Sequence, residues 1–377
     1  MKIAVVFDDG LDKPDGVQQC ILTLNNWLTK QGHEVHYIVG ETKRTDIPNV
    51  HVAARNIPVK FNGNRLTIPL PTSQAKLKTL LDEIQPDILH VHVPYSPFMG
   101  AKAIKAASPI VGVVGTFHVL PYGFVARYGT RLLGLWLRSS LRRFNALYAG
   151  TSAAAAFATW SMHLPTGTLP HPVNVAAFQT TKPAQRSDRL QVVFLGRLVA
   201  RKGALQLVQA IAGLSTATKS KIQVHLGGRG EQLDVLARLI ETHHLQDIIS
   251  MDGFISEAAK PSYLAQADIA IFPSISGESF GISLLEPMAA GAGVVVGGNN
   301  PGYASVLGAW PETLFDPTDT PAFTTYLEEL INNSQLRATI HASQQAAIKQ
   351  YDVTLIGQEW LKIYQHAIAA QAQTAKH

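Results

Sequence analysis

The chain of 377 residues contains a single cysteine, Cys20, and no long apolar run. One cysteine excludes an intramolecular disulfide framework and a cysteine-rich metal site, and it fits a reduced, cytoplasmic setting. No uninterrupted apolar stretch approaches the ~18–20 residues that a membrane-spanning helix needs. The N-terminal run KIAVVF is too short for the core of a signal peptide and is followed by two acids. We therefore expect a protein that is neither secreted by that route nor integral in a membrane.

Charged residues are also few: they make up 16% of the chain, whereas 46% of it is hydrophobic. This composition is typical of a well-packed globular protein, and the length predicts two domains of about 150–200 residues. The net charge of +5 is unevenly placed, because Lys and Arg outnumber Asp and Glu by 17 to 10 over residues 1–173 but are outnumbered 17 to 15 over residues 174–377. The first half is therefore expected to meet an anionic partner, with nucleic acid or anionic lipid as the candidates.

Short β-rich runs alternate with helical patterns in both halves, which predicts parallel, doubly wound sheets. We expect strands near residues 2–7, 33–40, 86–93, 109–118, 190–196, 221–228, 267–274 and 291–298. We expect helices near residues 16–32, 102–108, 203–214, 231–244 and 354–372, and a hinge at residues 169–178. The sequence thus predicts domains at 1–172 and 173–353, a final helical segment at 354–377, and a ligand cleft between the carboxyl ends of the two sheets.

Two cations follow the first expected strand of the second half, in the segment FLGRLVARKG, residues 194–203. Arg197 and Lys202 would lie at the carboxyl edge of that strand, just before a helix N-terminus, where cations suit a diphosphate. The alternative is a solvated basic loop. A second glycine-rich turn, LGGRGE at residues 226–231, lacks the G-x-G-x-x-G spacing of the dinucleotide fingerprint and is interpreted as a tight strand–helix turn.

Two glutamates flank an apolar run in the segment GESFGISLLEPMAAG, residues 277–291. Glu278 would lie in a loop at the mouth of the cleft, and Glu286 about two turns into the helix that follows. Carboxylates accept hydrogen bonds from sugar hydroxyls, while the backbone amides at the helix start favour an anion. The alternative makes Glu278 a capping acid and Glu286 a surface residue, but the apolar residues on both sides of Glu286 argue against a surface position.

The pattern E-S-F-G-x-x-x-x-E, together with the upstream G-R-x-x-x-R-K-G, resembles the retaining GT-B glycosyltransferases of family 4. The resemblance extends over almost the whole chain, because GVQQCILTLNNWLTKQGHEV, PDILHVHVPYSP, GTFH, NVAAF and YDVTLIGQEWLKIY occur in the family's order. Within the family the pattern is most similar to phosphatidylinositol mannosyltransferases, which take mannose from GDP-mannose. The resemblance implies a GT-B fold: an acceptor-binding and a nucleotide-sugar-binding Rossmann-like domain face each other across a cleft, and the C-terminal helix packs back on the first.

The resemblance also implies a role for each matching residue. Arg197 and Lys202 would bind the donor diphosphate, Glu286 the ribose hydroxyls, and Glu278 the hydroxyls of the transferred hexose. His118, which closes GTFH and would otherwise be a satisfied core histidine, would contact the hexose near the reacting carbon. Gly16 would let the backbone approach the phosphate, and residues Gly253, Phe254 and Ile255 would meet the base, with Lys260 reading it. The backbone around Ser279, Phe280, Gly281 and Ile282 would lie beside the hexose and phosphate.

Asp15 and Val93 depart from the family pattern, and Ser256 and Glu257 lie where the family varies. Asp15 stands where the family often has a glycine, and a carboxylate near a diphosphate is unfavourable, so it must point away or the loop must differ. Val93 stands where a glutamate is frequent, which puts an acceptor contact there in doubt. Ser256 and Glu257 occupy positions that vary with the nucleotide, so guanine is not settled over uracil.

A basic and apolar segment, RYGTRLLGLWLRSSLRRF at residues 127–144, bears on the partner of the first half. At about 100° per residue, its arginines Arg127, Arg131, Arg138 and Arg142 fall in one narrow sector of a single helix. The opposite side carries Leu132, Leu133, Trp136, Leu137, Leu141 and Phe144. This predicts an interfacial helix on an anionic membrane; the alternative is a helix packed on its own sheet with its arginines in solvent. Nucleic acid is the weaker candidate because no binding motif for it appears.

Together these features predict a retaining hexosyltransferase that uses a sugar nucleotide and works at the cytoplasmic face of the membrane on a lipid acceptor. His118, Glu278, Arg197 and Lys202 are the expected catalytic residues, and no residue stands out as a covalent nucleophile. No D-x-D metal motif is evident, so no protein-bound metal or tightly bound cofactor is expected, and Mg²⁺ would arrive with the nucleotide. The alternatives are a UDP-sugar transferase acting on diacylglycerol or another acceptor, a sugar-nucleotide 2-epimerase or phosphorylase, and a degenerate nucleotide-binding scaffold.

Overall fold

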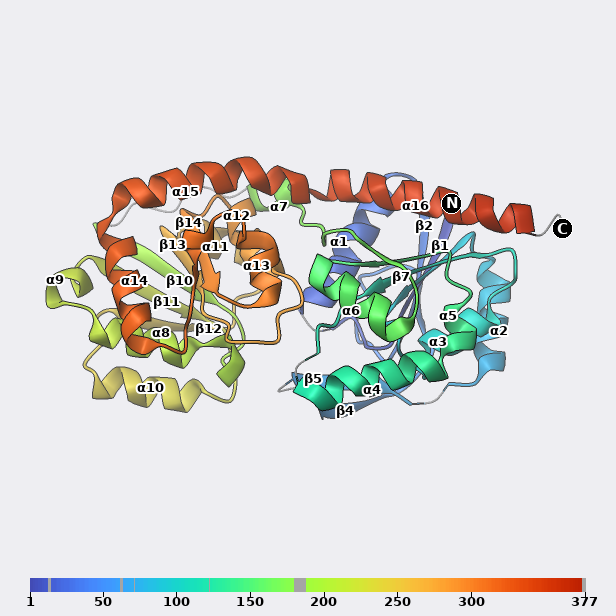
Figure 1. Cartoon of the computed structure of the whole chain (residues 1–377), viewed down its shortest axis with the longest axis horizontal. Helices are drawn as coiled ribbons and strands as arrows, with labels where there is room; N and C mark the ends of the chain where they lie inside the picture. The colour runs from blue at the N-terminus through green and yellow to red at the C-terminus, as the bar shows by residue number, and fades with distance from the viewer. Residues whose placement is uncertain (13–14, 62–63, 71, 122, 180–187, 375–377) are drawn as a thin grey trace. The chain divides into compact units, whose positions relative to one another are not determined.

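The computed structural model describes residues 1–12, 15–61, 64–70, 72–121, 123–179 and 188–374. The chain divides into two compact units (Figure 1): unit 1 comprises Met1–Pro172 with Val353–His377, and unit 2 comprises Val173–Asp352. Among the described residues, no helix has both the length and the apolar character needed to cross a bilayer.

Unit 1 is built on a parallel sheet of seven strands with helices on both faces. Its strands are β1 (Lys2–Phe7), β2 (Glu34–Val39), β3 (Val50–Val52), β6 (Ile88–His92), β7 (Gly112–Phe117), β8 (Ala146–Ala149) and β9 (Thr166–Thr168). Its helices are α1 (Gly16–Lys30), α2 (Gln74–Ile84), α3 (Gly100–Ala106), α4 (Gly123–Trp136), α5 (Arg138–Leu141), α6 (Ser152–Met162) and α16 (Val353–Thr374). The strand order is β3-β2-β1-β6-β7-β8-β9, and β4 (Asn56–Phe61) pairs antiparallel with β5 (Asn64–Pro69) as a separate hairpin.

Alternate residues of each central strand in unit 1 enter opposite cores, which is why the strands read as continuous apolar runs. Ile3, Val5 and Phe7 of β1 pack on one face, where α16 contributes Trp360 and Tyr364. Ala4 and Val6 pack on the other face, against residues of α2 and α3. The C-terminal helix α16 thus lies in the core of unit 1 and runs along its sheet (Figure 1).

Unit 2 has a parallel sheet of six strands in the order β12-β11-β10-β13-β14-β15. The strands are β10 (Leu190–Leu195), β11 (Ile222–Gly227), β12 (Ile249–Gly253), β13 (Ile269–Phe272), β14 (Val294–Gly298) and β15 (Leu314–Phe315). The α-helices are α7 (Val175–Gln179), α8 (Ala204–Gly213), α9 (Thr216–Lys219), α10 (Leu233–Thr242), α11 (Lys260–Ala265), α12 (Ile282–Ala289), α13 (Pro301–Leu307), α14 (Thr320–Asn332) and α15 (Ser334–Ala347), and the 3-10 turns are η1 (Ala200–Lys202), η2 (Pro311–Thr313) and η3 (Ile348–Tyr351).

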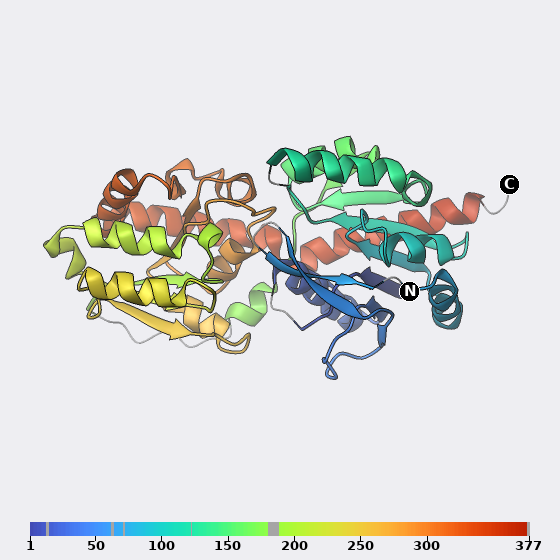
Figure 2. The same cartoon turned by 90° about the horizontal axis from the view of Figure 1, so that it is seen from below.

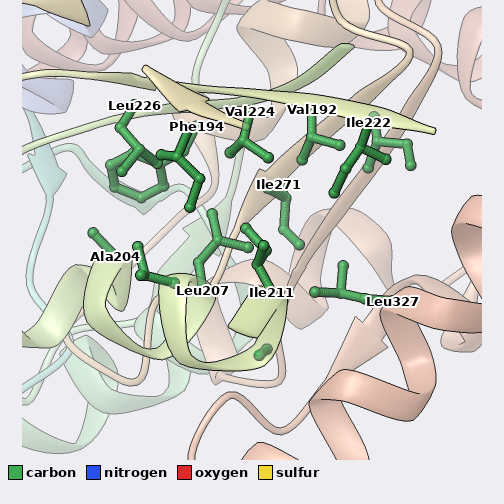
Figure 3. Packing of buried hydrophobic residues seen from close by; sticks show 14 of the residues in the cluster. Val192, Phe194, Ala204, Leu207, Ile211, Ile222, Val224, Leu226, Ile271 and Leu327 are labelled. Atoms are coloured by element: carbon green, nitrogen blue, oxygen red, sulfur yellow. The ribbon is translucent and has the colours of Figure 1, made fainter. Parts of the chain in front are cut away.

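Both faces of the unit 2 sheet are covered. Val192 and Phe194 of β10 pack with Leu207 and Ile211 of α8 in one core, as Figure 3 shows. Helices α8 and α10 lie side by side on that face (Figure 2), while Val193 enters the second core with residues of α12 and α13. Both sheets therefore have the strand order of a doubly wound fold, which confirms the predicted fold class.

Candidate active site

The order of strands reverses in unit 2 between β10 and β13, which are neighbours in the sheet but not in the chain. Ligands of doubly wound folds bind at the carboxyl ends of the strands beside such a switch point. The loop after β10 carries Arg197 to Lys202, and the loop after β13 carries Ser274 to Glu278. The amide of Ile275 donates to the carbonyl of Arg201 at 2.9 Å, so the two loops are bound to each other.

Two glycines let these loops pack closely. Gly203 has a φ of +77°, and a Cβ there would lie 1.9 Å from the carbonyl oxygen of Pro273. Gly228 has a φ of +140°, and its Cβ would lie 1.8 Å from the carbonyl oxygen of Gly196. Only glycine accepts both constraints. The turn LGGRGE is therefore a packing element that fixes the loop carrying Arg197.

Glu278 is the centre of a polar cluster. Its Oε1 accepts hydrogen bonds from Lys202 Nζ at 2.8 Å, Arg201 Nη1 at 2.9 Å and Ser274 Oγ at 2.8 Å. The side chains of Glu278, Arg201 and Lys202 are only 12%, 14% and 16% exposed. Burial raises the pKa of Glu278, but Lys202 and Arg201 outweigh that effect and leave the pKa below its ordinary value. The cluster therefore holds an ionised carboxylate between two cations, and net positive charge remains.

Arg197 is exposed at the same strand end. Burial is the main cause that lowers the pKa of Lys202. The attraction of Glu278 opposes it, and the charges of Arg201 and Arg197 lower the pKa further. Arg197 and Lys202 lie in the same loop, which begins at this strand end. The structure brings together three of the predicted residues here, Arg197, Lys202 and Glu278.

Glu286 lies in α12 and forms a second ion pair. Its Oε1 accepts a hydrogen bond from Lys260 Nζ at 2.9 Å, and Lys260 also pairs with Glu257 at 2.8 Å. Lys260 is 9% exposed; burial lowers its pKa, but Glu286 and Glu257 outweigh this and raise it. Lys260 thus links Glu286 to the loop that carries Glu257.

The helix α12 is fixed by its apolar side chains. Leu284, Leu285 and Phe280 are buried in the core of unit 2, so Glu278 and Glu286 are both held on a rigid support. Gly281 is the N-cap residue and is buried, and in the described part of the chain no side chain caps this helix start. Ser279 and Ile282 lie directly before and after Phe280 and Gly281 in the chain.

The end of β12 and the loop after it carry the residues that were expected to meet the base. Gly253 has a φ of +70°, and its carbonyl accepts a hydrogen bond from the amide of Gly228 at 2.6 Å. The ring of Phe254 is 54% exposed, with the guanidinium of Arg229 5.7 Å from its centroid. Ile255 is half-buried. An exposed aromatic ring beside a cation suits a planar, electron-rich ligand.

The other predicted donor contacts belong to unit 1. Gly16 is the first residue of α1, and the carboxylate of Asp15 caps that helix by accepting hydrogen bonds from the amides of Val17 and Gln18, both at 3.1 Å. Asp15 thus turns its carboxylate onto the start of α1.

His118 follows β7 and is 5% exposed. Its Nε2 lies 2.8 Å from Nδ1 of His92, and its ring stacks on that of His92. Burial, followed by the neighbouring His171 and His92, lowers the pKa of His118 well below its ordinary value. The ring is therefore neutral at physiological pH.

The prediction of a single helix at residues 127–144 is wrong, both in the extent of the helix and in the side that it turns to solvent. The structure has α4 and α5, with Leu137 between them as the N-cap of α5. Arg127 and Arg131 place their guanidinium groups over the ring of Trp160, at 5.1 and 4.5 Å from its centroid. Arg131 also donates to the carbonyl of Trp160 at 2.9 Å, because α4 packs on α6 through this side.

The apolar residues expected on the other side of that segment are partly buried and partly exposed to solvent. Leu137 and Leu141 are buried in unit 1, whereas Leu132 is 66% and Trp136 70% exposed. Leu133 and Phe144 are half-buried, and Arg138 and Arg142 are exposed. The exposed apolar residues of α4 form a stripe that we call the α4 stripe: Phe124, Val125, Tyr128, Leu132, Leu135 and Trp136.

Sequence reasoning missed two residues of the Glu278 cluster, Arg201 and Ser274. The signal for Arg201 was present in the paired cations of VARKG, but only the 3-10 turn η1 turns both side chains to one carboxylate. The signal for Ser274 was its position just after β13, at the carboxyl edge where ligands bind. In the part of the chain that the structure describes, no group of three or more His, Cys, Asp or Glu is arranged to hold a metal ion.

Comparison with known proteins identifies both units. Residues 14–176 match the family described as Glycosyltransferase Family 4, and residues 177–347 match the family described as Glycosyl transferases group 1. The phosphatidyl-myo-inositol mannosyltransferase of Mycolicibacterium smegmatis is 27% identical over 97% of this chain and 94% of its own length. The GDP-mannose-dependent alpha-(1-6)-phosphatidylinositol monomannoside mannosyltransferase of the same organism is 26% identical over 89% of this chain and 91% of its own.

A solved structure supports the fold. A glycosyltransferase from Rickettsia africae superposes with a TM-score of 0.75 at 18% identity, covering 97% of this chain and 98% of that one. The family matches, the two doubly wound units and the cluster at the switch point agree with one another. The chain belongs to the GT-B glycosyltransferases that combine the family 4 and group 1 domains, and it is a hexosyltransferase.

Proposed function

We propose that the protein transfers mannose from GDP-mannose to a phosphatidylinositol lipid with retention of configuration. The observation that carries this proposal is the Glu278 cluster: an ionised acid with two cations at the switch point of unit 2, followed eight residues later by Glu286. The choice of mannose and of the lipid is supported by the relatives: both names give a mannosyltransferase and a phosphatidylinositol lipid, and one of them gives GDP-mannose dependence.

In this proposal the donor is held mainly by unit 2. Arg197 and Lys202 bind the diphosphate, and Glu278 accepts hydrogen bonds from the hexose hydroxyls. Glu286 accepts from the ribose, with Lys260 orienting its carboxylate at 2.9 Å. The remaining contacts are the base against Gly253, Phe254 and Ile255, the hexose and phosphate against the backbone at Ser279, Phe280, Gly281 and Ile282, and the phosphate near Gly16 of unit 1.

The transfer step breaks the bond between the anomeric carbon and the diphosphate oxygen and forms one to the acceptor oxygen. Negative charge grows on the leaving diphosphate, so Arg197 and Lys202, with Arg201 beside them, stabilise the transition state. In front-face attack the proton of the acceptor hydroxyl passes to the leaving phosphate oxygen, which needs no protein nucleophile. His118 contacts the hexose near the reacting carbon as a neutral ring. A Mg²⁺ ion, where one takes part, arrives with the nucleotide.

We further propose that the α4 stripe docks unit 1 on the cytoplasmic face of an anionic membrane, where the lipid acceptor lies. Six large apolar side chains are exposed on one helix, a concentration typical of an interfacial helix. Exposed Arg138 and Arg142 follow the stripe directly, and the chain up to residue 173 has an excess of positive charge. Apolar insertion then supplies most of the binding, and the arginines favour anionic lipids.

The test is a panel of labelled GDP- and UDP-sugars incubated with the protein and vesicles that contain phosphatidylinositol or diacylglycerol. We expect labelled glycolipid from GDP-mannose with phosphatidylinositol, and an α-linked product because configuration is retained. A product only from UDP-sugars would show that the donor is not GDP-mannose. A product only on diacylglycerol would show that the acceptor is not phosphatidylinositol. Conversion of the sugar nucleotide without acceptor to an epimer, or no turnover of any donor, would overturn the proposal.

A further inference from the structure

Four buried histidine rings form a continuous row inside unit 1. His90 stacks on His92 with centroids 4.3 Å apart, His92 on His118 at 5.1 Å, and His118 lies 5.0 Å from His171. His90 and His92 are alternate residues of β6, so both side chains leave the same face of the sheet. None of the four is more than 6% exposed. The row connects the predicted catalytic His118 to the core beneath it.

The hydrogen bonds along the row are unevenly distributed. Both ring nitrogens of His90 are bonded, Nδ1 to the hydroxyl of Tyr364 and Nε2 to that of Thr116, each at 2.8 Å. His92 and His118 share one bond, between His92 Nδ1 and His118 Nε2 at 2.8 Å. The other nitrogens, His92 Nε2 and His118 Nδ1, are buried and have no hydrogen-bond partner among the described residues.

This arrangement constrains the proton of each ring. A neutral imidazole has one N–H donor and one acceptor nitrogen, so one ring of the pair must donate to the other. Whichever donates, the bond fixes His118 through its Nε2 edge and leaves Nδ1 as the only ring atom with unused hydrogen-bonding capacity. A buried polar atom without a partner in a native fold calls for an explanation, and a ligand hydroxyl is one.

The residue after His92 strengthens the case for a fixed geometry. Val93 has a φ of +65°, a left-handed conformation that a β-branched residue rarely adopts. Its amide donates to the carbonyl of Thr116 at 3.3 Å, and its carbonyl accepts from the amide of Ser96 at 3.0 Å. Unfavourable backbone of this kind persists where the surroundings hold it and gathers at functional sites.

We propose that His92 is a positioning residue for sugar transfer: it holds His118 by the Nε2 edge so that Nδ1 meets a hydroxyl of the transferred hexose. The inference rests on the proposed function, since it takes the contact between His118 and the hexose from there. His92 itself touches no substrate.

Three substitutions separate the hydrogen bond from the packing. In His92→Asn the side-chain amide occupies about the position of Nδ1 and can keep the bond to His118. In His92→Gln the amide occupies the position of Nε2 instead, and in His92→Phe the stacking stays but no polar group remains. His90→Phe is the matched control, because it loses two hydrogen bonds in the same row without touching His118.

We expect kcat to fall about 100-fold in His92→Phe and His92→Gln, as for a catalytic group displaced by about 1 Å, with the KM for the donor unchanged. His92→Asn should recover most of kcat, and His90→Phe should keep it at a temperature where the variant is folded. Equal rates in the Asn, Gln and Phe variants would overturn the inference, as would a loss of kcat in His90→Phe as large as that in His92→Phe.

A second measurement does not depend on turnover. In protein labelled with ¹⁵N-histidine, NMR should show a hydrogen-bonded His118 Nε2 in the wild type and in His92→Asn, and lose that signature in His92→Phe. An unchanged signature in His92→Phe would overturn the inference by itself. If the wild type transfers no sugar from any donor, the proposed function fails and the role of His92 fails with it; if the wild type is active and His92→Phe is unimpaired, the inference alone fails.

Discussion

One carboxylate oxygen of Glu278 accepts hydrogen bonds from two cations and a hydroxyl, so this single atom organises the loops after β10 and β13. A largely buried acid in such a position costs free energy unless cations surround it, and here they do. Lys202 can also bind a diphosphate, because its ammonium group carries three N–H donors and Glu278 uses one of them. Glu278 therefore orients Lys202 and Arg201 before the donor binds.

We expect Glu278→Ala and Lys202→Ala to abolish transfer while the protein stays folded, with rates lowered by at least about 10²–10³-fold, as when one electrostatic contact to a transition state is removed. Glu278→Gln keeps the size of the side chain and an acceptor for Ser274 but loses the charge, so it should be nearly as inactive. Rates with labelled donor, and circular dichroism for the fold, are the measurements. Glu241→Gln, an exposed acid of α10, is the control. Transfer retained in Glu278→Ala or Lys202→Ala would refute the assignment.

The sequence predicted which residues of the cluster follow strands, but not which partner each side chain contacts. Arg197, Lys202 and Glu278 lie where parallel strands end at one edge, a placement that the order of strands and helices already implies. The pairing of Lys260 with Glu286 was not predicted, because it depends on how α11 packs against α12. A motif therefore identifies residues at a site, while the partner of each side chain is set by packing between elements that are distant in sequence.

At the scale of elements, α4 shows where a helical pattern misleads. The spacing of four arginines predicted one amphipathic helix with a basic face, but the structure ends α4 at Trp136 and turns Arg127 and Arg131 onto Trp160 of α6. Cation–π contact and a hydrogen bond to a carbonyl offset the loss of water around Arg131. The face left to solvent is the apolar one, which periodicity alone could not decide because Trp160 belongs to another helix.

If the α4 stripe enters the membrane, the double substitution Leu132→Ser with Trp136→Ser should weaken binding to vesicles by at least about tenfold. Burying each side chain is worth about 1.5–3 kcal/mol, and both are largely exposed, so the fold should tolerate the change. Arg138→Ser with Arg142→Ser should instead reduce the preference for anionic lipids and its salt dependence. Co-sedimentation with anionic and neutral vesicles at low and high salt measures both effects. Failure of the wild type to pellet with anionic vesicles at low salt would remove the membrane proposal.

At the scale of the whole molecule, two sheets with the same winding explain why the alternation of strands and helices predicted the fold class. The hairpin of β4 and β5 was not predicted, because two antiparallel strands outside the main sheet leave no alternating β–α signal. The short helix α7 was also missed, since the stretch at residues 169–178 shows no periodicity and Asp352, far along the chain, accepts a hydrogen bond from the amide of Val175 at 3.2 Å. Long-range contacts of this kind are not visible in a local pattern.

The row of histidines should make unit 1 sensitive to acid. Burial lowers the pKa of His90 to about 3 and of His171 to about 4, and those of His92 and His118 fall well below the ordinary value of 6.5. Depressed pKa values in the folded state mean that the stability these rings supply is complete above about pH 6.5 and is lost as the pH falls toward 4, by about 1.4 kcal/mol per pH unit for each ring.

Buried Asp8 acts in the opposite direction, because burial raises its pKa to about 6 and protonation relieves that cost as the pH falls. Four rings outweigh one carboxyl, so the free energy of unfolding of unit 1 should drop steeply between pH 6.5 and 5. Urea unfolding followed by tryptophan fluorescence across that range measures the slope, which should become shallower by about a third in His90→Phe. A stability independent of pH between 7 and 5 would show that the rings are not held neutral by burial.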